Sequence, residues 1–425
     1  MRPLPCALPL YGATTPARLG AQLYRTLLHS RPSPPHGHNG ITPPRVLAPD
    51  EILDRIPELP REGLRGALAW EDAQVFDSER PVLAFVRSAI ARGALAVNYT
   101  RADGLDADNG RVTGLRVSRP NGDTFTVRAR HVIDCSGQWN FLATAAGTRP
   151  SRYVFGLNIV TPPVSTSVFA FGLPARGERE TPTWFVTPWR GHSIIGTLWS
   201  DSTGDAPDGS RDSAAVATLV DGFNRSFAGR PITIDDVRIV LGARVPARER
   251  AGRAKGAATL DRTRVIDHAA HGMAGAFTVL APKLTTALSS ASQVMSRLVP
   301  GYRMPSTGEL PRLVGGDIDD WSQFSGRWIA RGVPQDVVQG YGDETPRIVK
   351  GNAPSLNLMV RHAVEHELAV NLPDVVLRRC ALAATGPPAK AIVAAAADEM
   401  AARLGWDDTE RRRQVECLAR CFEGS

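Results

Sequence analysis

Residues 275–286 read Gly-Ala-Phe-Thr-Val-Leu-Ala-Pro-Lys-Leu-Thr-Thr, and a helix-like run follows from Ala287 to Val299. The first half is apolar and β-branched, and it ends at Pro282, next to Lys283. This order predicts a strand, a turn and a helix whose first turn offers hydroxyls and unpaired amides, which suit an anionic ligand. An ordinary connection between a strand and a helix has the same pattern, so both interpretations remain open.

The composition is that of a globular protein with more than one domain. A chain of 425 residues exceeds the size that one hydrophobic core usually supports, so we expect two or three domains. A net charge of +7 suits anionic ligands or lipid surfaces. The lysines and arginines are scattered, without interleaved aromatic residues, which argues against nucleic acid as a partner. No segment approaches the ~20 apolar residues of a membrane span, so any membrane contact would be peripheral.

The cysteines indicate a reducing, cytoplasmic compartment. There are five, without a Cys-x-x-Cys pair, which argues against a disulfide framework and a structural zinc site. Cys417 and Cys421 share a helical face and are expected to pack. Three prolines interrupt the apolar run in residues 1–10, so we do not expect a signal peptide there.

The first 150 residues mix helix and strand signals, as one part of an α/β nucleotide-binding domain would. We expect one helix to bury a leucine face, formed by Leu19, Leu23, Leu27 and Leu28. The predicted order is a helix at Pro16–Leu28, a loop at Arg31–Pro49, a helix at Ser78–Arg92 that ends at Gly93, strands at Leu95–Thr100, Val112–Val117 and Thr124–Ala129, and a buried strand from His131 to Gly137, with Trp139 opening a helix. The Gly-x-Gly-x-x-Gly turn that normally begins a dinucleotide-binding domain is absent.

The rest of the chain changes from β-rich to helical. We expect strands at Tyr153–Val160, Ser167–Phe171, Thr183–Thr187, Ser193–Leu198 and Val237–Leu241, and a helix at Asp212–Phe227. Residues 305–345 are rich in Gly, Pro and Asp and predict a connection with a short helix inside. Helices are expected at Ser355–Val370, Pro373–Ala384, Pro388–Leu404 and Asp408–Phe422.

Several motifs occur in an order that resembles a known family. They are Trp70-Glu-Asp-Ala-Gln74, Asn98-Tyr-Thr100, Asp134-Cys-Ser-Gly-Gln-Trp139, Ile194-Ile-Gly-Thr197, Gly242-Ala-Arg-Val-Pro246, Lys283-Leu-Thr-Thr286, Asp374-Val-Val-Leu-Arg-Arg379 and Leu404-Gly-Trp406. From Arg2 to Glu416 the chain resembles the FAD-dependent glycerol-3-phosphate dehydrogenases, among the D-amino-acid-oxidase-like flavoenzymes.

The resemblance implies an α/β plus α fold. It consists of an incomplete FAD-binding domain of the glutathione-reductase type, a β-rich substrate domain and a C-terminal helical cap. The expected division is 1–150 for the FAD-binding domain, 151–240 for the substrate domain, 241–304 for the return of the FAD-binding domain, 305–345 for a linker and 346–425 for the cap.

The resemblance also implies roles for individual residues. Next to FAD we expect Thr100, Arg101, Gly137, Trp139, Lys283, Leu284, Thr285 and Thr286. Arg244 and Lys283 would be catalytic, and Asn158, Arg244 and Arg262 would bind a small anionic substrate. A planar guanidinium can orient an anion, and a lysine can stabilise negative charge on a reduced flavin. A quinone would accept the electrons, and the protein could contact the inner face of the cytoplasmic membrane.

The chain departs from the family pattern at residues that would bind ligands. Asn158 replaces a histidine, Leu198-Trp199 replace Thr-Asp, and Ala281-Pro282 replace two glycines. Arg262 corresponds to the second substrate arginine only after a shift of one residue. Without a first βαβ unit, the amides and helix dipole that hold a diphosphate are missing, so we predict that the chain as given binds FAD weakly or not at all.

Two functional hypotheses follow. The first is a shortened and diverged flavin-dependent dehydrogenase that oxidises glycerol 3-phosphate or a related anion. The second is a non-catalytic remnant or binding module that keeps the substrate layer and the cap. His362, Glu365 and His366 have the spacing of an inverted zinc protease motif, in which two imidazoles and a carboxylate could bind zinc. A third ligand is not evident and the same residues fit the helical cap of the family, so we expect no metal.

Overall fold

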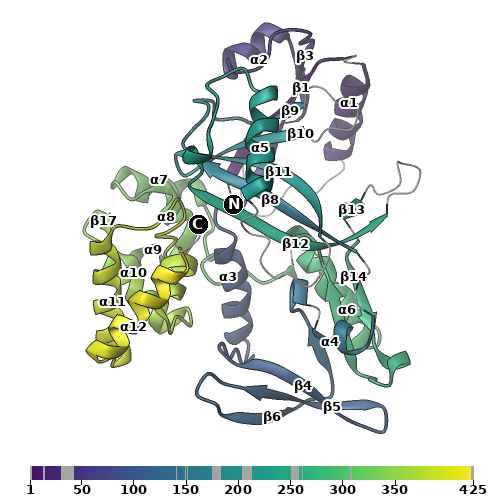
Figure 1. The fold of residues 1–425 in the computed structure, drawn as a ribbon, viewed down its shortest axis with the longest axis vertical. Coiled ribbons are helices and arrows are strands. Elements are labelled where there is room, and N and C mark those ends of the chain that lie inside the picture. Colours follow the sequence, from purple (N-terminus) through teal and green to yellow (C-terminus); the bar gives the residue numbers. More distant parts are fainter. Residues whose placement is uncertain are drawn as a thin grey trace.

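The computed structural model describes residues 2–422 except 13–14, 30–42, 140, 149, 151, 175–182, 203–212, 250–257, 261 and 307–308. Figure 1 shows a large sheet in the upper half of the molecule, the C-terminal helices on the left and a small antiparallel sheet at the bottom. Helix α3 (Glu79–Ile90) runs down the middle, from the large sheet towards the small one.

The large sheet contains nine strands among the described residues, in the order β13-β12-β8-β11-β10-β9-β1-β3-β2. Their bounds are β1 Arg2–Leu10, β2 Arg45–Leu47, β3 Gly66–Gln74, β8 Tyr153–Thr161, β9 Ala170–Pro174, β10 Thr183–Trp189, β11 His192–Ser202, β12 Ile239–Glu249 and β13 Ala258–Leu260. Helices α2 (Pro49–Arg55) and α5 (Ser213–Ser226) close its main core, where Leu157, Ile159 and Phe223 are buried. The β-rich prediction is confirmed, although β9 and β12 begin two or three residues later than expected.

Strand β1 replaces the proline-rich segment from which we predicted no structure. It pairs with β3 along all nine residues but with β9 only at Cys6 and Ala7. Amides alternate sides along a strand, and Pro3, Pro5 and Pro9 are separated by even numbers of residues. The missing donors therefore all face one side, and the ladder on the other side stays intact.

A separate sheet carries the stretch that opened the sequence analysis. Its order is β14-β15-β7, with β14 at Arg264–Asp267, β15 at Ala276–Leu280 and β7 at Val132–Asp134. Strands β15 and β7 are parallel, so their carboxyl ends lie at the same edge. Helix α6 (Ala287–Leu298) follows β15, and α4 (Phe141–Ala145) follows β7. The predicted strand, turn and helix at 275–299 are confirmed.

The region around α3 differs from the prediction. Helix α3 forms as expected, but residues 95–100 form no strand, and the side chain of Leu95 is 95% exposed. Beyond them the predicted hairpin is confirmed as part of a three-stranded sheet, formed by β4 (Arg101–Asp108), β5 (Arg111–Ser118) and β6 (Thr124–Arg128). A strand without a partner strand gains no ladder hydrogen bonds, which explains why the strand-like sequence stays irregular.

The N-terminal helix corrects a second expectation. Helix α1 (Thr15–His29) exists, but Leu19 and Leu23 are 61% and 64% exposed, so the prediction that they face the core is wrong. The side chains of Leu27 and Leu28 lie outside the described residues. So does most of the expected loop with His36 and His38, although β2 lies within its predicted bounds.

The C-terminal part is helical. Its elements are α7 (Trp321–Ala330), α8 (Gln335–Tyr341), α9 (Thr345–Ile348), α10 (Leu356–His366), the π-helix η8 (Asp374–Arg379), α11 (Lys390–Leu404), α12 (Asp408–Arg420) and the short strands β16 (Val349–Lys350) and β17 (Ala353–Pro354). Met359, Val360 and Ala363 of α10 are buried in its core. Helices α7 and α8 lie inside the segment expected to be a linker, and Tyr341 of α8 joins the same core.

Candidate functional site

The turn after β15 places Lys283 at the carboxyl edge of the three-stranded sheet. Lys283, Leu284 and Thr285 are exposed, and the 3-10 turn η5 (Leu284–Thr286) leads directly into α6. The Thr286 hydroxyl donates to the Lys283 carbonyl at 2.8 Å and also bonds the Thr263 hydroxyl at 2.9 Å. The hydroxyl thus fixes the turn, while the lysine side chain extends to solvent.

The turn after β7 reaches the same edge. The Asp134 carboxylate accepts hydrogen bonds from the backbone N–H groups of Ser136 and Leu142, each at 2.8 Å, and so holds the turn. Gly137 has φ +66°, and a Cβ placed on it would meet no atom within 4 Å. Trp139 is 58% exposed. Because β7 and β15 are parallel, Gly137 and Lys283 leave the sheet at one edge, with open space beside the glycine.

Strand β12 lies next to this edge, because it contacts the 3-10 turn that contains Gly137. The Arg244 guanidinium lies 4.1 Å from the centre of the Tyr153 ring. Its Nε is buried and has no hydrogen-bond partner among the described residues. A buried guanidinium N–H without an acceptor costs free energy, so this position favours an anionic or carbonyl ligand.

Asn158 lies near Arg244 but on the other face of the large sheet. Its Oδ1 accepts from the Thr197 hydroxyl at 2.9 Å, and it pairs across the strands with Leu241. Leu241 and Arg244 are three residues apart, and side chains alternate along a strand, so their side chains point to opposite faces. The expected substrate residues therefore do not share one face.

The remaining expected residues divide between two places. Arg262 is exposed and precedes Thr263, whose hydroxyl bonds Thr286, so it lies beside the Lys283 turn. Arg101 begins β4, is 80% exposed at its side chain and pairs with Asp103 at 2.7 Å. Thr100 precedes it and bonds back to the Asn98 carbonyl. Among the described residues, neither Thr100 nor Arg101 forms a hydrogen bond or ion pair with the edge that carries Gly137 and Lys283.

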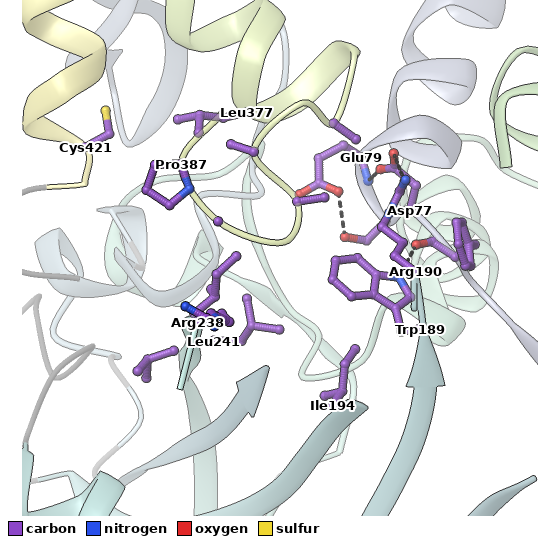
Figure 2. A pocket seen from close by; sticks show the side chains of 18 of the residues that line it. Asp77, Glu79, Trp189, Arg190, Ile194, Arg238, Leu241, Leu377, Pro387 and Cys421 are labelled. Carbon is purple, nitrogen blue, oxygen red and sulfur yellow. Dashed lines mark hydrogen bonds and ion pairs between the residues drawn. The ribbon is translucent and has the colours of Figure 1, made fainter. Parts of the chain in front are cut away.

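A cavity of about 450 Å³ lies between the large sheet and the C-terminal helices (Figure 2). Its walls are mostly apolar and include Trp189, Ile194 and Leu241 on the sheet side and Leu377, Pro387 and Phe422 on the helical side. Ile194 and Leu241 belong to the sheet face that carries Asn158, because the three residues lie on paired or alternate positions. The cavity therefore lies on the same face of the large sheet as Asn158, which does not itself line it.

The polar end of this cavity is built around Arg190. Arg190 occupies the two-residue turn between β10 and β11, with Gly191, and both have positive φ, as a type I′ hairpin requires. Its guanidinium donates to Asp336 at 2.8 Å, pairs with Asp77 at 3.5 Å and stacks 4.6 Å from the Phe76 ring centre. Figure 2 shows Asp77 and Arg190 side by side at the cavity.

Burial raises the pKa of Asp77 to about 6, with Glu79 adding to the effect and Arg190 opposing it. Such a carboxyl can take up and release a proton near neutral pH. Sequence reasoning missed Asp77 and Arg190, because neither lies in a motif with a recognisable spacing. The two-residue turn at Arg190-Gly191 was the only available signal.

A third cluster consists of buried charges. Glu344, His362 and Glu367 bring ligand-type atoms within 4.8 Å of one another, as a metal site would. Two arginines of α3 already bind them: Arg87 donates to both oxygens of Glu344 at 2.5 and 2.8 Å, and Arg80 donates to Glu367 at 2.6 Å. Two neighbouring guanidinium charges repel a divalent cation, so the cluster is an ion network between α3 and the cap.

This network also separates the motif that resembled a zinc site. His362 lies 3.5 Å from Glu344 and 3.3 Å from Glu367, inside the network. Glu365, in contrast, pairs with Arg403 at 3.2 Å on the surface. The spacing that placed His362, Glu365 and His366 on one helix therefore produces packing and ion pairs.

With this geometry, the chain can be assigned to a family. Residues 5–288, more than half of the chain, match the family described as FAD dependent oxidoreductase, and the chain belongs to that family. Residues 312–411 match the C-terminal domain of alpha-glycerophosphate oxidase.

Individual relatives agree with this assignment. A glycerol-3-phosphate dehydrogenase of Synechocystis is 23% identical over 98% of this chain and 81% of the relative. Glycerol-3-phosphate dehydrogenase 1 of Mycobacterium tuberculosis is 26% identical over 79% of this chain and 66% of the relative. The structure of the Bacillus halodurans glycerol-3-phosphate dehydrogenase complexed with FAD has a TM-score of 0.72 and 18% identity, and it covers all of this chain and 82% of that one. This last likeness shows the fold.

The described residues fit one end of a flavin. The open space at Gly137, the exposed Lys283 and the unpaired N–H of Arg244 suit a ring with carbonyl oxygens. The sequence contains no Gly-x-Gly-x-x-Gly turn, and β15 is followed by Ala281-Pro282, where the backbone cannot approach a diphosphate as closely as glycine allows. The diphosphate end is therefore not provided by the described residues.

No helix among the described residues is long and apolar enough to cross a membrane.

Proposed function

We propose that the chain is an FAD-dependent oxidoreductase of the glycerol-3-phosphate dehydrogenase and oxidase type. The observation that carries the proposal is the meeting of Gly137, Lys283 and the strand of Arg244 at one edge of the three-stranded sheet. The two family matches support it, because together they span most of the chain in the order of the two domains.

The substrate we infer is glycerol 3-phosphate or a related small anionic alcohol. Flavin supplies the chemistry of accepting a hydride, here from the secondary alcohol. Arg244 would bind and orient the anion through its free Nε–H, with Arg262 near the lysine turn as a second cation. Lys283 would stabilise negative charge on the ring.

For the electron acceptor, the family resemblance favours a quinone, and the cavity of Figure 2 supports that choice. Its apolar walls suit a planar ring, and a carboxyl with a pKa of about 6 at Asp77 can exchange the protons that accompany two-electron reduction. Molecular oxygen, as in an oxidase, needs no such cavity.

A non-catalytic remnant or binding module is the second candidate. The placement of Asn158 and Arg244 on opposite faces of the sheet favours it, because a small substrate cannot contact both. This candidate predicts anion binding at Arg244 without any reduction of flavin.

The two candidates are separated by an anaerobic reduction experiment. Glycerol 3-phosphate is added to protein loaded with FAD, and loss of the visible absorbance of oxidised flavin is followed. We expect glycerol 3-phosphate to reduce the flavin of the parent protein rapidly, without an added dye. In Arg244→Met the reduction should be slower by about tenfold to a thousandfold, because one charged contact to the reacting substrate is removed. Arg248→Met, an exposed arginine of the same strand, is the matched control and should keep the rate. Loaded protein that stays oxidised would contradict the dehydrogenase proposal and favour the binding module.

A further inference from the structure

The pair formed by Asp77 and Arg190 lies where three parts of the chain meet. Arg190 occupies the turn between β10 and β11, Asp77 lies between β3 and α3, and Asp336 belongs to α8. The Arg190 guanidinium is 2.8 Å from the Asp336 carboxylate and 3.5 Å from that of Asp77. The side chains of Asp77 and Arg190 are only 15% and 16% exposed. One largely buried cation therefore joins the large sheet to the segment before α3 and to the cap.

The chain passes from the sheet to the cap around Asp77. Before it, the Phe76 carbonyl accepts a hydrogen bond from the Trp189 indole of the β10–β11 hairpin at 2.7 Å. After it, Arg80 donates to the Gly340 carbonyl at 2.8 Å and to Glu367 at 2.6 Å, both in the cap. The chain is thus held by the sheet up to residue 76 and by the cap from residue 80. A movement of the cap relative to the sheet would be absorbed in the short segment that contains Asp77.

Asp77 also lies between two cavities. It lines the cavity of Figure 2, of about 450 Å³, together with Arg190. It also lines a second cavity, of about 470 Å³, between α3 and α8, together with Asp336. The contact between Arg190 and Asp336 therefore crosses from one cavity to the other. Because the cavity of Figure 2 has one wall on the sheet and one on the cap, any separation of the two opens it.

The surroundings of Asp77 oppose its ionised form in this closed arrangement. Burial raises the pKa of Asp77 to about 6, Glu79 adds to the effect, and Arg190 and Arg80 oppose it. In an open arrangement, water would return the pKa of Asp77 towards its ordinary value of 3.8. The closed arrangement thus binds the proton more tightly, so protonation of Asp77 favours closure and its ionisation favours opening.

Other charged or titratable groups face the same junction. The His192 ring of β11 forms a hydrogen bond with the Arg190 carbonyl at 3.0 Å, and histidine also changes charge between pH 5 and 8. The remaining groups are Asp336 of α8, Arg238 before β12, Cys421 after α12, and Arg87 and Glu344 across the second cavity.

We propose that Asp77 and Arg190 form a proton-controlled latch between the large sheet and the cap, which keeps the cavity of Figure 2 closed when Asp77 is protonated and lets it open when Asp77 is ionised. Arg190 supplies the attraction to the cap through Asp336, in both protonation states of Asp77. The inference goes beyond the proposed function, because it concerns access to the cavity, whichever molecule binds there.

An introduced thiol measures the opening directly. Ala383→Cys places a thiol in the cap wall of the cavity, at a position that is 7% exposed. Its rate of reaction with dithiodipyridine is measured by peptide mass spectrometry at pH 5 and pH 7.5, with and without Asp77→Asn. The exposed Cys135, which lines neither cavity, is the internal reference for the reagent. Neither FAD nor substrate is needed.

The ratio of the two rates at one pH, without and with Asp77→Asn, cancels the chemistry of the thiol itself. We expect this ratio to be about tenfold higher at pH 7.5 than at pH 5, which is the factor that pKa values of 3.8 and 6 give over this range. A ratio that stays constant, or that falls as the pH rises, would overturn the proposal.

Three further variants assign the effect to individual residues. Arg190→Met removes the ion pair to Asp336 and should raise the rate at both pH values. Asp54→Asn, at an exposed carboxyl of α2, is the matched control for Asp77→Asn and should leave the rates unchanged. His192→Gln should keep the pH dependence. An unchanged rate in Arg190→Met would overturn the latch, and so would a pH dependence that His192→Gln abolishes.

Discussion

The two sides of α3 differ in how completely their interactions are satisfied. On the cap side, Arg80 and Arg87 enter a buried network with Glu344, Glu367 and His362, whose side chains are between 0% and 12% exposed. On the sheet side, the same helix presents Val82, which is 47% exposed, and Val86 to an open groove of about 550 Å³ that Val97 and Leu284 also line. Charged groups are buried and apolar groups are exposed, the reverse of the usual distribution.

Helix α3 is therefore held to the cap by ion pairs, while its apolar face towards the three-stranded sheet stays exposed. A buried ion network stabilises mainly when every member is present, because a single removal leaves an uncompensated charge. An exposed apolar face, in contrast, contributes stability only when a partner covers it. The following predictions test each side, beginning with the largest effect.

Removal of one arginine from the network should be strongly destabilising. Arg87→Met leaves Glu344 buried with no bidentate partner, and we expect a loss of about 3–5 kcal/mol in the free energy of unfolding. Urea unfolding measures this difference. Arg101→Met removes an exposed ion pair with Asp103 and should cost at most about 1 kcal/mol. Equal losses in the two variants would show that the buried network contributes no more to stability than an exposed ion pair.

The Asp77 carboxyl, which lines the cavity of Figure 2, should lower the free energy of unfolding at neutral pH. Its folded-state pKa of about 6 lies above the ordinary value of 3.8, so the folded state binds more protons than the unfolded state between these values. Stability is therefore lost as the pH rises from about 4 to 6. Asp77→Asn removes this penalty and should stabilise the protein by at most about 3 kcal/mol at pH 7, because each pKa unit is worth about 1.4 kcal/mol.

The check is urea unfolding of parent and Asp77→Asn at pH 4.5 and pH 7. The advantage of the variant should be larger at the higher pH. An advantage that is constant with pH would show that the carboxyl is not perturbed.

His362 should give the network a pH dependence of defined sign. Burial lowers the pKa of His362, but Glu344 and Glu367 beside it outweigh burial and raise the pKa above its ordinary value of 6.5. The protonated form is favoured by folding, so its stabilisation is fully present below 6.5 and is lost as the pH rises through the raised pKa. Relative to His362→Gln, the parent protein should lose stability as the pH rises above about 6.5. A parent that gains stability over this range would contradict the assignment.

The smallest effect is expected on the uncovered side. Leu95→Ser replaces a side chain that is 95% exposed, so the free energy of unfolding of the chain alone should change by less than about 0.5 kcal/mol. A loss of more than about 2 kcal/mol would show that Leu95 is buried and that the sheet side is already complete.

The sequence predicted those elements whose partners lie close in the chain. The hairpin at 111–128, the strand and helix at 276–298 and the helices α10, α11 and α12 were all identified, because their turns and apolar stripes are local. The sequence-based prediction was wrong where the structure of a segment depends on a neighbour that is distant in the chain. Residues 95–100 have strand sequence but no partner strand among the described residues, and Leu19 and Leu23 form an apolar stripe that the core does not cover.

The candidate site shows the same limit. Gly137 and Lys283 could be predicted to meet, because each follows a strand of one parallel pair. Arg190 and Asp77 could not, because a hairpin turn and a connecting segment distant in sequence bring them together. The opposite orientation of Asn158 and Arg244 depends on strand register, which a family motif does not specify.

The most direct test is the crystallographic position of the flavin ring in protein loaded with FAD. We predict that the ring lies at the carboxyl edge of β7 and β15, with Gly137 and Lys283 in contact with it and the Arg244 Nε within hydrogen-bond distance of the ring or of a bound anion. A ring found instead in the cavity between Asp77, Arg190 and Leu377 would contradict the assignment of this edge as the cofactor site.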